Sequence, residues 1–339
     1  MKERLNYIDA IRGFAIFLVV YLHFGAWSMS VTVPNKFIEI AESFFIPLFF
    51  FISGFIGYKE EIKNNLGGAL LWNKTKTLLI PTITFFLLAA WHFGFSPFGW
   101  LQGGTKAGYW FAYILFQLFV IYYGIKVILS YVKTKKYELL LFGVLLAECF
   151  IGCYALCGTL VGDFLSTNLV VYSGFIYFFT GLLAGRYRKT FLTLQDNKWY
   201  IWGLLAFTLI EWNIIPIHWT VHCLSMTLLV FALFYHERKW FDGNYWYQRL
   251  LPMMGRYSLA IYFLHYWLLF DMPEEVSNWI NWTAEQPCFV PGGSSVFAYN
   301  LIVVPVVLVT CLTCCFIKRL LAFIPYANQI LFGDKSEQQ

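Results

Sequence analysis

The chain has 339 residues, of which 59% are hydrophobic and only 13% charged, and its mean hydropathy is +0.62. Soluble globular proteins carry about a quarter of their residues as charged side chains. Half that charge, spread over apolar runs of about twenty residues, excludes a soluble enzyme and predicts a polytopic membrane protein. The net charge of +5 therefore bears on membrane topology and gives no sign of nucleic-acid binding.

Ten apolar segments follow one another, so the sequence predicts an all-α bundle of about ten transmembrane helices. They cover approximately residues 8–28, 37–58, 74–95, 109–130, 138–160, 168–186, 199–215, 218–235, 255–271 and 296–318. The seventh and eighth should form a hairpin, because the loops at 186–198 and 236–256 are both basic and should lie on one side. We expect residues 1–320 to form a single integral-membrane domain and residues 321–339 a short cytoplasmic tail.

The basic residues are distributed very unevenly between the two sides of this ten-span arrangement. Of the 24 Lys and Arg residues, only Lys36 and Lys106 fall in the outer loops, and the last outer loop, about 272–295, has none. The positive-inside rule therefore places both termini in the cytoplasm. The expected location is the cytoplasmic (plasma) membrane, with the lipid bilayer as the surrounding solvent.

The eight cysteines predict neither a disulfide framework nor a metal site. Two groups of three lie inside apolar runs, as small packing residues do: Cys149, Cys153 and Cys157, and Cys311, Cys314 and Cys315. No group of His and Cys residues has the spacing of zinc ligands. We therefore expect no metal cofactor.

Three ionisable residues lie in the first span: Asp9, Arg12 and His23. Such residues are costly inside a membrane, which makes each one a functional candidate. Arg12 and His23 are eleven residues apart, three helical turns plus roughly 20°, so they share a face about 16 Å apart along the axis. Alone, Arg12 could reach the inner interface and His23 could bond a neighbouring helix. Together they favour a lined cavity, where a neutral imidazole can accept a proton.

Further candidates for ligand binding lie near the cytoplasmic side of the next two spans. Lys74 and Lys76 open the third span at the level of Arg12, where they could anchor the helix or bind a phosphorylated ligand. Ser53 and Gly54 in the second span could be a close-packing pair. They could equally let a ligand approach the backbone.

The ninth span carries Ser258, Tyr262 and His265 at positions i, i+4 and i+7. This spacing forms one polar stripe on a membrane helix. A packing network and a ligand-lined cavity explain such a stripe equally well. His265 is therefore the rival of His23 as the central histidine.

Candidates for binding an acceptor lie in the fourth and fifth spans. Trp110, Tyr113 and Gln117 begin the fourth span on its outer side, where an aromatic platform could hold a sugar. Glu148, inside the fifth span, has no partner nearby in the sequence. A carboxylate there must pair, become protonated or face water.

Taken in order, these motifs resemble the acyltransferase-3 family of integral membrane enzymes, which O-acylate cell-surface and exported carbohydrates. The resemblance begins with Tyr-Ile-Asp-Ala-Ile-Arg12-Gly-Phe-Ala, continues through His23, and includes Phe-Phe-Phe-Ile-Ser53-Gly54-Phe. It extends to Tyr109-Trp110-Phe111 and to Gly255-Arg-Tyr-Ser258-Leu-Ala-Ile-Tyr262-Phe-Leu-His265. With ten spans, it covers essentially the whole chain.

The resemblance implies an acyl-CoA co-substrate, with acetyl-CoA the expected one, bound from the cytoplasm. It implies that Arg12 contacts this donor and that His23 is the essential histidine, which would act as general base. The acceptor would be a hydroxyl of a surface or exported glycan. Where family members often have Arg-x-x-Arg entering the third span, this chain has Lys74-x-Lys76.

The residues then suggest a division of roles. We expect Arg12, Lys74, Lys76, Ser53 and Arg256 to bind the donor, and Glu148, Trp110, Gln117, Tyr262 and His265 to bind the acceptor. The alternative is a transporter or flippase that exports a glycan or a lipid-linked sugar past the same intramembrane charges. The lack of internal repeats in the sequence stands against that alternative. Nothing in the sequence predicts an oligomeric state.

Overall fold

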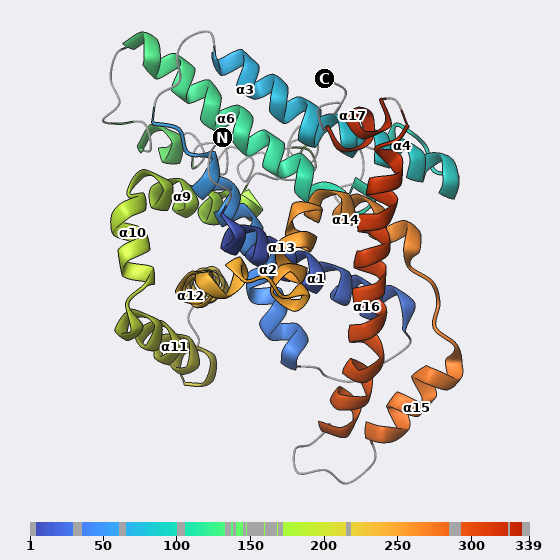
Figure 1. Cartoon of the computed structure of the whole chain (residues 1–339). Helices are drawn as coiled ribbons and strands as arrows, with labels where there is room; N and C mark the ends of the chain where they lie inside the picture. Colours follow the sequence, from blue (N-terminus) through green and yellow to red (C-terminus); the bar gives the residue numbers. More distant parts are fainter. Residues whose placement is uncertain are drawn as a thin grey trace. The chain divides into compact units, whose positions relative to one another are not determined.

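The computed structural model describes residues 5–29, 36–60, 66–99, 106–132, 137, 140–144, 147, 159, 168, 172–214, 218–284, 293–324 and 326–333. Within these residues every regular element is a helix and none is a strand (Figure 1). Six helical runs are long and apolar enough to cross a membrane. The prediction of an all-α membrane bundle is therefore confirmed. The number of ten spans and the cytoplasmic termini remain predictions.

The chain divides into two compact units. The first comprises Met1–Phe49 and Lys189–Leu320, and the second comprises Phe50–Arg188 and Leu321–Gln339. One helix, α2 (Lys36–Gly57), contributes its first part to one unit and its last part to the other.

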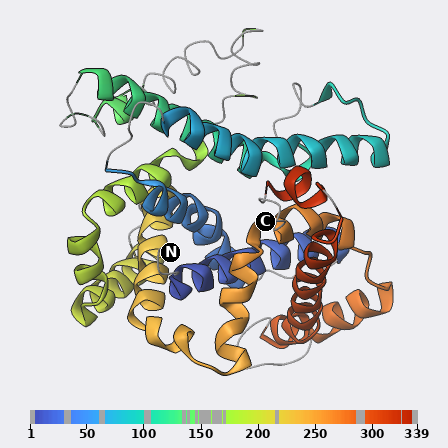
Figure 2. The same cartoon turned by 45° about the horizontal axis from the view of Figure 1, so that its top comes forward.

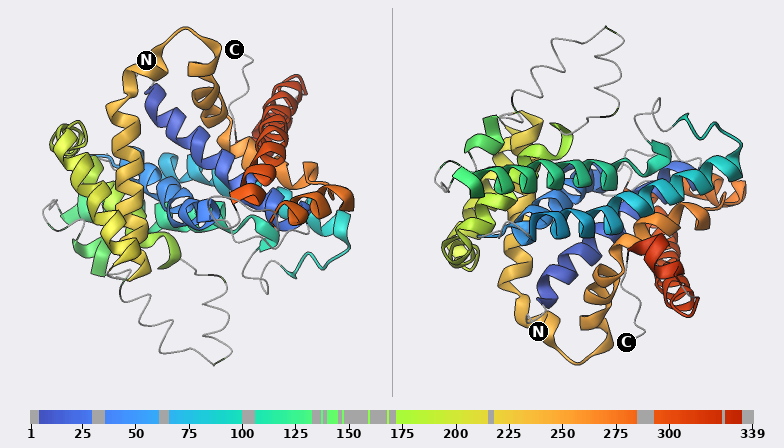
Figure 3. Two further views of the ribbon diagram at one scale, coloured as in Figure 1. Left: turned by 90° about the horizontal axis from the view of Figure 1, so that it is seen from below. Right: turned by 90° about the horizontal axis from the view of Figure 1, so that it is seen from above.

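The first unit is built around α1 (Asn6–Ser28), an apolar helix most of whose side chains are buried. In Figure 3, α1 lies between α12 (Trp219–His236) and α13 (Trp246–Arg256), and it contacts both of them. The other elements of this unit are α10 (Arg188–Gln195), α11 (Lys198–Asn213), η3 (Arg238–Asp242), α14 (Ser258–Leu264), η4 (His265–Leu268), α15 (Glu274–Ala284) and α16 (Gly293–Leu321).

Helices α1 and α13 cross with no side chain between their backbones. A Cβ atom on Gly255 would lie 1.7 Å from the carbonyl oxygen of Asp9, and one on Gly13 would lie 2.0 Å from that of Leu251. Both positions therefore require glycine. Small residues that let two backbones approach are a common means of packing helices inside membranes.

The predicted hairpin of the seventh and eighth spans is confirmed, since α11 and α12 pack together in the first unit. Near the turn, His222 Nδ1 lies 3.4 Å from Glu211 Oε2. At the opposite end, Arg238 donates two hydrogen bonds to the carboxylate of Asp196, at 2.8 and 3.1 Å. The segments that precede and follow the hairpin thus meet, as the two basic loops required.

The prediction of a single helix over residues 255–271 is wrong. The segment breaks at Tyr257, whose φ and ψ of −101° and 11° end α13, and α14 then runs for only seven residues before η4. Apolar periodicity hid this break, because the residues on both sides of Tyr257 are compatible with a helix. The contact of Gly255 with α1 holds the end of α13 in place.

The second unit contains a helical run that begins earlier than predicted. Helix α3 starts at Leu66, not at residue 74, and continues through the π-helical turn η1 (Thr75–Leu79) into α4 (Ile80–Phe93). The predicted apolar segment begins too late because residues 66–73 include two glycines, a tryptophan and an asparagine, and directly follow a polar stretch. Lys74 and Lys76 thus lie well inside the run rather than at its start.

Three further helices and a short turn also belong to the second unit. They are η2 (Lys106–Gly108), α6 (Trp110–Val132), α9 (Tyr172–Arg186) and α17 (Ala327–Phe332). Helix α17 lies in the predicted tail and packs against η1 and α4 (Figure 2). Its C-cap, Gly333, has a φ of +68°, and a Cβ atom there would lie 2.3 Å from the carbonyl oxygen of Lys76.

The described cysteines agree with their predicted packing role. Cys223, Cys311, Cys314 and Cys315 are free and buried. The second apolar cysteine cluster, Cys149, Cys153 and Cys157, lies outside the described residues.

The glycine crossing yields a stability prediction. We expect Gly255→Ala to lower the free energy of unfolding by about 1–3 kcal/mol or more, because the added methyl group would overpack the crossing. The measurement is thermal or denaturant unfolding in detergent. Gly203→Ala in α11 is the matched control, because nothing lies within 4 Å of a Cβ atom at that position. If the two variants have the same free energy of unfolding, the backbones of α1 and α13 do not meet at Gly255.

The Asp196–Arg238 ion pair yields a pH prediction. Its hydrogen bonds lower the pKa of the Asp196 carboxyl. A lowered carboxyl pKa stabilises the fold above the unfolded pKa of about 4, and this contribution is lost as pH falls through the folded pKa. At pH 7 the free energy of unfolding of the wild type should therefore be higher than that of Asp196→Asn. The difference should be less than about 1 kcal/mol, because the pair is exposed. The difference should vanish in acid, and a difference that is constant with pH would exclude the pair as its cause.

Candidate active site

Two predicted site residues, Arg12 and His23, lie on α1, and both are half-buried. The helix is unbroken between them, so eleven residues correspond to a separation of about 16 Å along its axis. Arg12 lies in the second turn of α1, and His23 lies near its C-terminal end. The helix therefore carries a permanent cation and a titratable imidazole at two levels.

The two rival histidines are hydrogen-bonded to each other. His23 Nδ1 lies 2.8 Å from His265 Nε2, and the two rings are stacked with their planes 4° apart. His265 is completely buried. The sequence singled out both residues as intramembrane polar groups, and the fold brings them together into one pair.

The hydrogen bonds define which nitrogen carries each proton. His265 Nδ1 lies 2.9 Å from the carbonyl oxygen of Ile261, which can only accept, so this nitrogen carries a hydrogen. A neutral His265 then has its lone pair on Nε2, and His23 Nδ1 must donate to it. The opposite assignment would make His265 a buried cation, which is costly. The lone pair of neutral His23 therefore lies on Nε2.

That basic nitrogen faces Tyr266. The Tyr266 hydroxyl lies 3.2 Å from His23 Nε2, at a distance suited to donating a hydrogen bond. The Tyr266 ring also stacks obliquely on His265, with centroids 4.1 Å apart. Sequence analysis missed this tyrosine, because nothing but its place beside His265 distinguishes it among 22 tyrosines. Each nitrogen of His23 thus has a defined partner.

The fold holds this pair from two sides. His23 follows Gly13 by ten residues, and His265 follows Gly255 by ten, so both histidines lie at the same number of residues from the glycine crossing. Beyond the pair, the backbone N–H of Met272 donates to the carbonyl oxygen of Ser28 at 2.8 Å. The pair is therefore bracketed by contacts between the same two segments.

The rest of the predicted polar stripe also lies near this pair. Tyr262 is buried on α14, and its ring centroid is 6.4 Å from that of His265. Ser258, at the start of α14, is half-buried. Tyr262 and His265 thus face a common region of the first unit.

The predicted donor-binding cations belong to different units. Arg12 lies in the first unit, whereas Lys74 and Lys76 lie in the second. The Lys74 amine lies 3.7 Å from the centroid of the Phe119 ring, and that of Lys76 lies 5.8 Å from Trp72. Convergence of these three cations at one opening remains a prediction.

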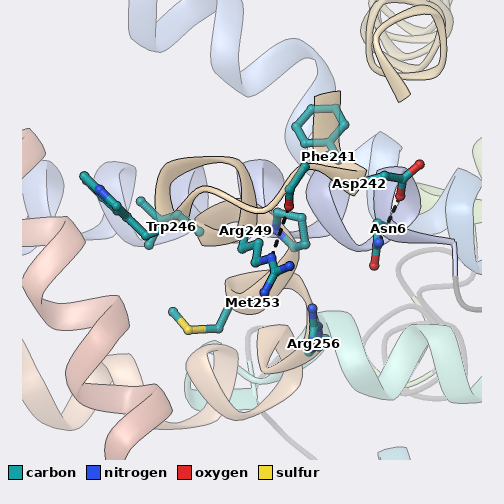
Figure 4. A pocket seen from close by; sticks show the side chains of 10 residues that line it. Asn6, Phe241, Asp242, Trp246, Arg249, Met253 and Arg256 are labelled. Atoms are coloured by element: carbon teal, nitrogen blue, oxygen red, sulfur yellow. Dashed lines mark hydrogen bonds between the residues drawn. The ribbon is translucent and has the colours of Figure 1, made fainter. Parts of the chain in front are cut away.

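Arg256, another predicted donor-binding residue, lines an open cavity of about 550 Å³ in the first unit (Figure 4). It is exposed at the last residue of α13. Arg249 lines the same cavity and was not singled out from the sequence. Its position in a predicted basic loop concealed it, because interfacial arginines are common in membrane proteins.

The close-packing interpretation holds for Gly54 in the second span. A Cβ atom on Gly54 would lie 2.1 Å from the carbonyl oxygen of Phe178, so α2 and α9 pack backbone to backbone there. The neighbouring Ser53 is half-buried. Its predicted role in donor binding remains a prediction.

Two other predicted acceptor residues, Trp110 and Gln117, lie in the first three turns of α6. Trp110 is half-buried, and Gln117 donates a hydrogen bond to the carbonyl oxygen of Asn168. A residue that the sequence did not single out, Lys106, is buried beside them and donates to Asn168 Oδ1 at 2.8 Å. Burial lowers the pKa of its amine. Glu148 lies outside the described residues.

The fold and the intramembrane histidine pair define a multi-pass membrane protein with the groups needed for acid–base chemistry. The pattern of the acyltransferase-3 family, described as an acyltransferase domain, matches residues 5–319, nearly the whole chain. The chain belongs to this family and is a membrane acyltransferase. This membership decides against the alternative of a glycan exporter. No characterised protein and no solved structure matches the chain significantly.

Proposed function

We propose that this protein transfers an acyl group, acetyl in the first instance, from cytoplasmic acyl-CoA to a hydroxyl of a surface or exported glycan. The observation that carries the proposal is the bond between His23 and His265. It fixes a neutral imidazole with its lone pair on Nε2, which is the form that a general base needs. The expected location is the plasma membrane.

In the proposed reaction the acceptor hydroxyl takes the place of the Tyr266 hydroxyl at His23 Nε2. As its oxygen bonds to the thioester carbonyl carbon, its proton passes to Nε2. The carbon–sulfur bond then breaks, and the CoA thiolate takes that proton, so His23 returns to its neutral form. His265 Nε2 accepts the Nδ1 proton in a hydrogen bond throughout, which stabilises the transient imidazolium of His23.

Donor binding would rest on the four cations predicted from the sequence. Arg12 and Arg256 in the first unit, with Lys74 and Lys76 in the second, would bind the phosphates of CoA through charge-assisted hydrogen bonds. Ser53 would contribute a hydroxyl beside Gly54. The acyl thioester would then lie along the α1 face that leads from Arg12 to His23.

Acceptor binding rests on the polar and aromatic residues predicted from the sequence. Trp110 would stack on a sugar ring and Gln117 would bond its hydroxyl groups, since aromatic and amide side chains suit carbohydrates. Tyr262 would line the reacting end of this site, and His265 would act there through its hydrogen bond to His23. Glu148 would orient the acceptor from the fifth span.

The first functional prediction concerns the two histidines. We expect His23→Ala to reduce acetyl transfer from labelled acetyl-CoA by about 100- to 10,000-fold, because a positioned base is lost. His265→Ala should lower kcat with little change in KM, since His265 acts through His23. His265→Gln should recover part of the activity, because its amide oxygen can accept from His23 Nδ1.

The control is His92→Ala, which changes an exposed histidine at the end of α4. All variants are compared in equal, folded amounts. Retention of more than about a tenth of the activity in His23→Ala would exclude His23 as the base. Complete loss in His265→Ala with full activity in His23→Ala would reverse the two roles.

The second functional prediction concerns Arg12. We expect Arg12→Ala to weaken acetyl-CoA binding by about 10- to 100-fold, the usual value of a charge-assisted hydrogen bond. Arg12→Lys should also bind more weakly than wild type, because lysine lacks the bidentate guanidinium. Calorimetry on the purified protein measures both affinities. Unchanged affinity in Arg12→Ala would remove this residue from the donor site.

A further inference from the structure

The cavity lined by Arg256 also carries aromatic and acidic side chains, which the binding of phosphates alone would not require. It is enclosed by the first residues of α1, by the end of η3 and by α13, all in the first unit (Figure 4). Trp246, Arg249, Met253 and Arg256 all line it from α13. Their spacing of three, four and three residues places them on one face of this helix.

The two arginines of the cavity have different surroundings. Arg249 donates from Nε to the carbonyl oxygen of Gly243 at 3.1 Å and from Nη2 to Asn244 Oδ1 at 2.5 Å. These bonds fix its guanidinium and leave Nη1 to a ligand. Arg256 is exposed and makes no hydrogen bond or ion pair with any described residue. One arginine is thus held in place and the other is available.

The remaining polar and aromatic groups complete a varied lining. Trp246 is 75% exposed, so one face of its indole is open to a ligand. Asp242 Oδ1 accepts a hydrogen bond from Asn6 Nδ2 at 2.9 Å, which orients the carboxylate across from the arginines. The cavity therefore offers two cations, a planar ring and a hydrogen-bond acceptor.

We propose that this cavity binds the nucleotide portion of the acyl-CoA donor. The adenine ring would stack on Trp246, the phosphates would bond Arg249 and Arg256, and Asp242 would accept from the ribose hydroxyl or the adenine amino group. This inference rests on the proposed function. The alternative ligand is the anionic headgroup of a phospholipid. Such a headgroup would bind the arginines, but Asp242 would repel it and Trp246 would have no contact with it.

The cavity and the histidine pair lie at opposite ends of the same pair of segments. Asn6 begins α1, whose far end carries His23, and Arg256 ends α13, which is followed by α14 and His265. Arg256 and His265 lie on either side of α14, whose seven residues span roughly 10 Å. An extended pantetheine arm reaches over such a distance, so a nucleotide held here would deliver its thioester to His23.

The test measures binding of adenosine 3′,5′-bisphosphate, which has the nucleotide but no thioester, to the full-length protein in zwitterionic lipid nanodiscs. We expect Arg249→Ala to weaken this binding by about 10- to 100-fold and Trp246→Ala by about tenfold. Lys239→Ala is the matched control, because it removes an exposed cation from η3 that does not line the cavity. Its affinity should stay within about twofold of wild type.

Activity then separates this inference from the proposed function. Acetyl transfer from acetyl-CoA should fall in Arg249→Ala, whereas transfer from S-acetylpantetheine, which lacks the nucleotide, should equal that of wild type. If Arg249→Ala and Trp246→Ala bind the bisphosphate as tightly as Lys239→Ala, the inference is overturned while the transferase activity can stand. In a second set of nanodiscs that contain anionic phospholipid, loss of bound phospholipid in Arg249→Ala with unchanged nucleotide affinity would overturn it too. If wild type transfers acetyl from neither donor, the proposed function itself fails.

Discussion

The contact between the backbones of α1 and α13 is the constraint on which the site depends. At this crossing Gly13 and Gly255 leave no room for a Cβ atom, so the two helices meet at one fixed point along their lengths. Because His23 and His265 each follow that point by ten residues, the crossing also determines that the two rings meet. The bond from Met272 to Ser28 holds the same segments together beyond the histidines.

Once the rings meet, burial leaves them little choice of hydrogen bonding. A polar side chain that is fully buried in a membrane protein must have partners, and His265 finds one in the carbonyl oxygen of Ile261 and the other in His23. The break between α13 and α14 at Tyr257 gives α14 its own direction from the end of α13. The fold thus converts two polar residues that are far apart in the sequence into an ordered pair, in which the lone pair of His23 Nε2 faces Tyr266.

The sequence predicted the long helices well, because hydropathy over about twenty residues reports membrane burial directly. It failed where the signal is local. The break at Tyr257 has no proline, and the glycines and Asn73 in α3 lower the mean hydropathy at the beginning of a continuous helix. In the site, His23, His265 and Arg12 could be recognised from the sequence, because ionisable residues are rare inside apolar segments. Tyr266 and Arg249 belong to types that are common at such positions, so only their three-dimensional neighbours distinguish them.

The hydrogen bonds also favour one of two routes for the acyl group. In a relay through acyl-histidine, His23 Nε2 would be acylated, and the ring would stay positively charged until its Nδ1 proton left. Among the described residues, the acceptor for that proton is His265 Nε2, and the other nitrogen of His265 donates to a carbonyl oxygen that cannot take a proton onward. The intermediate would therefore keep a cation in the buried pair for its whole lifetime, which is costly. In the proposed direct transfer, the pair carries that charge only while the hydroxyl proton passes through His23, which supports the general-base role that we propose for it.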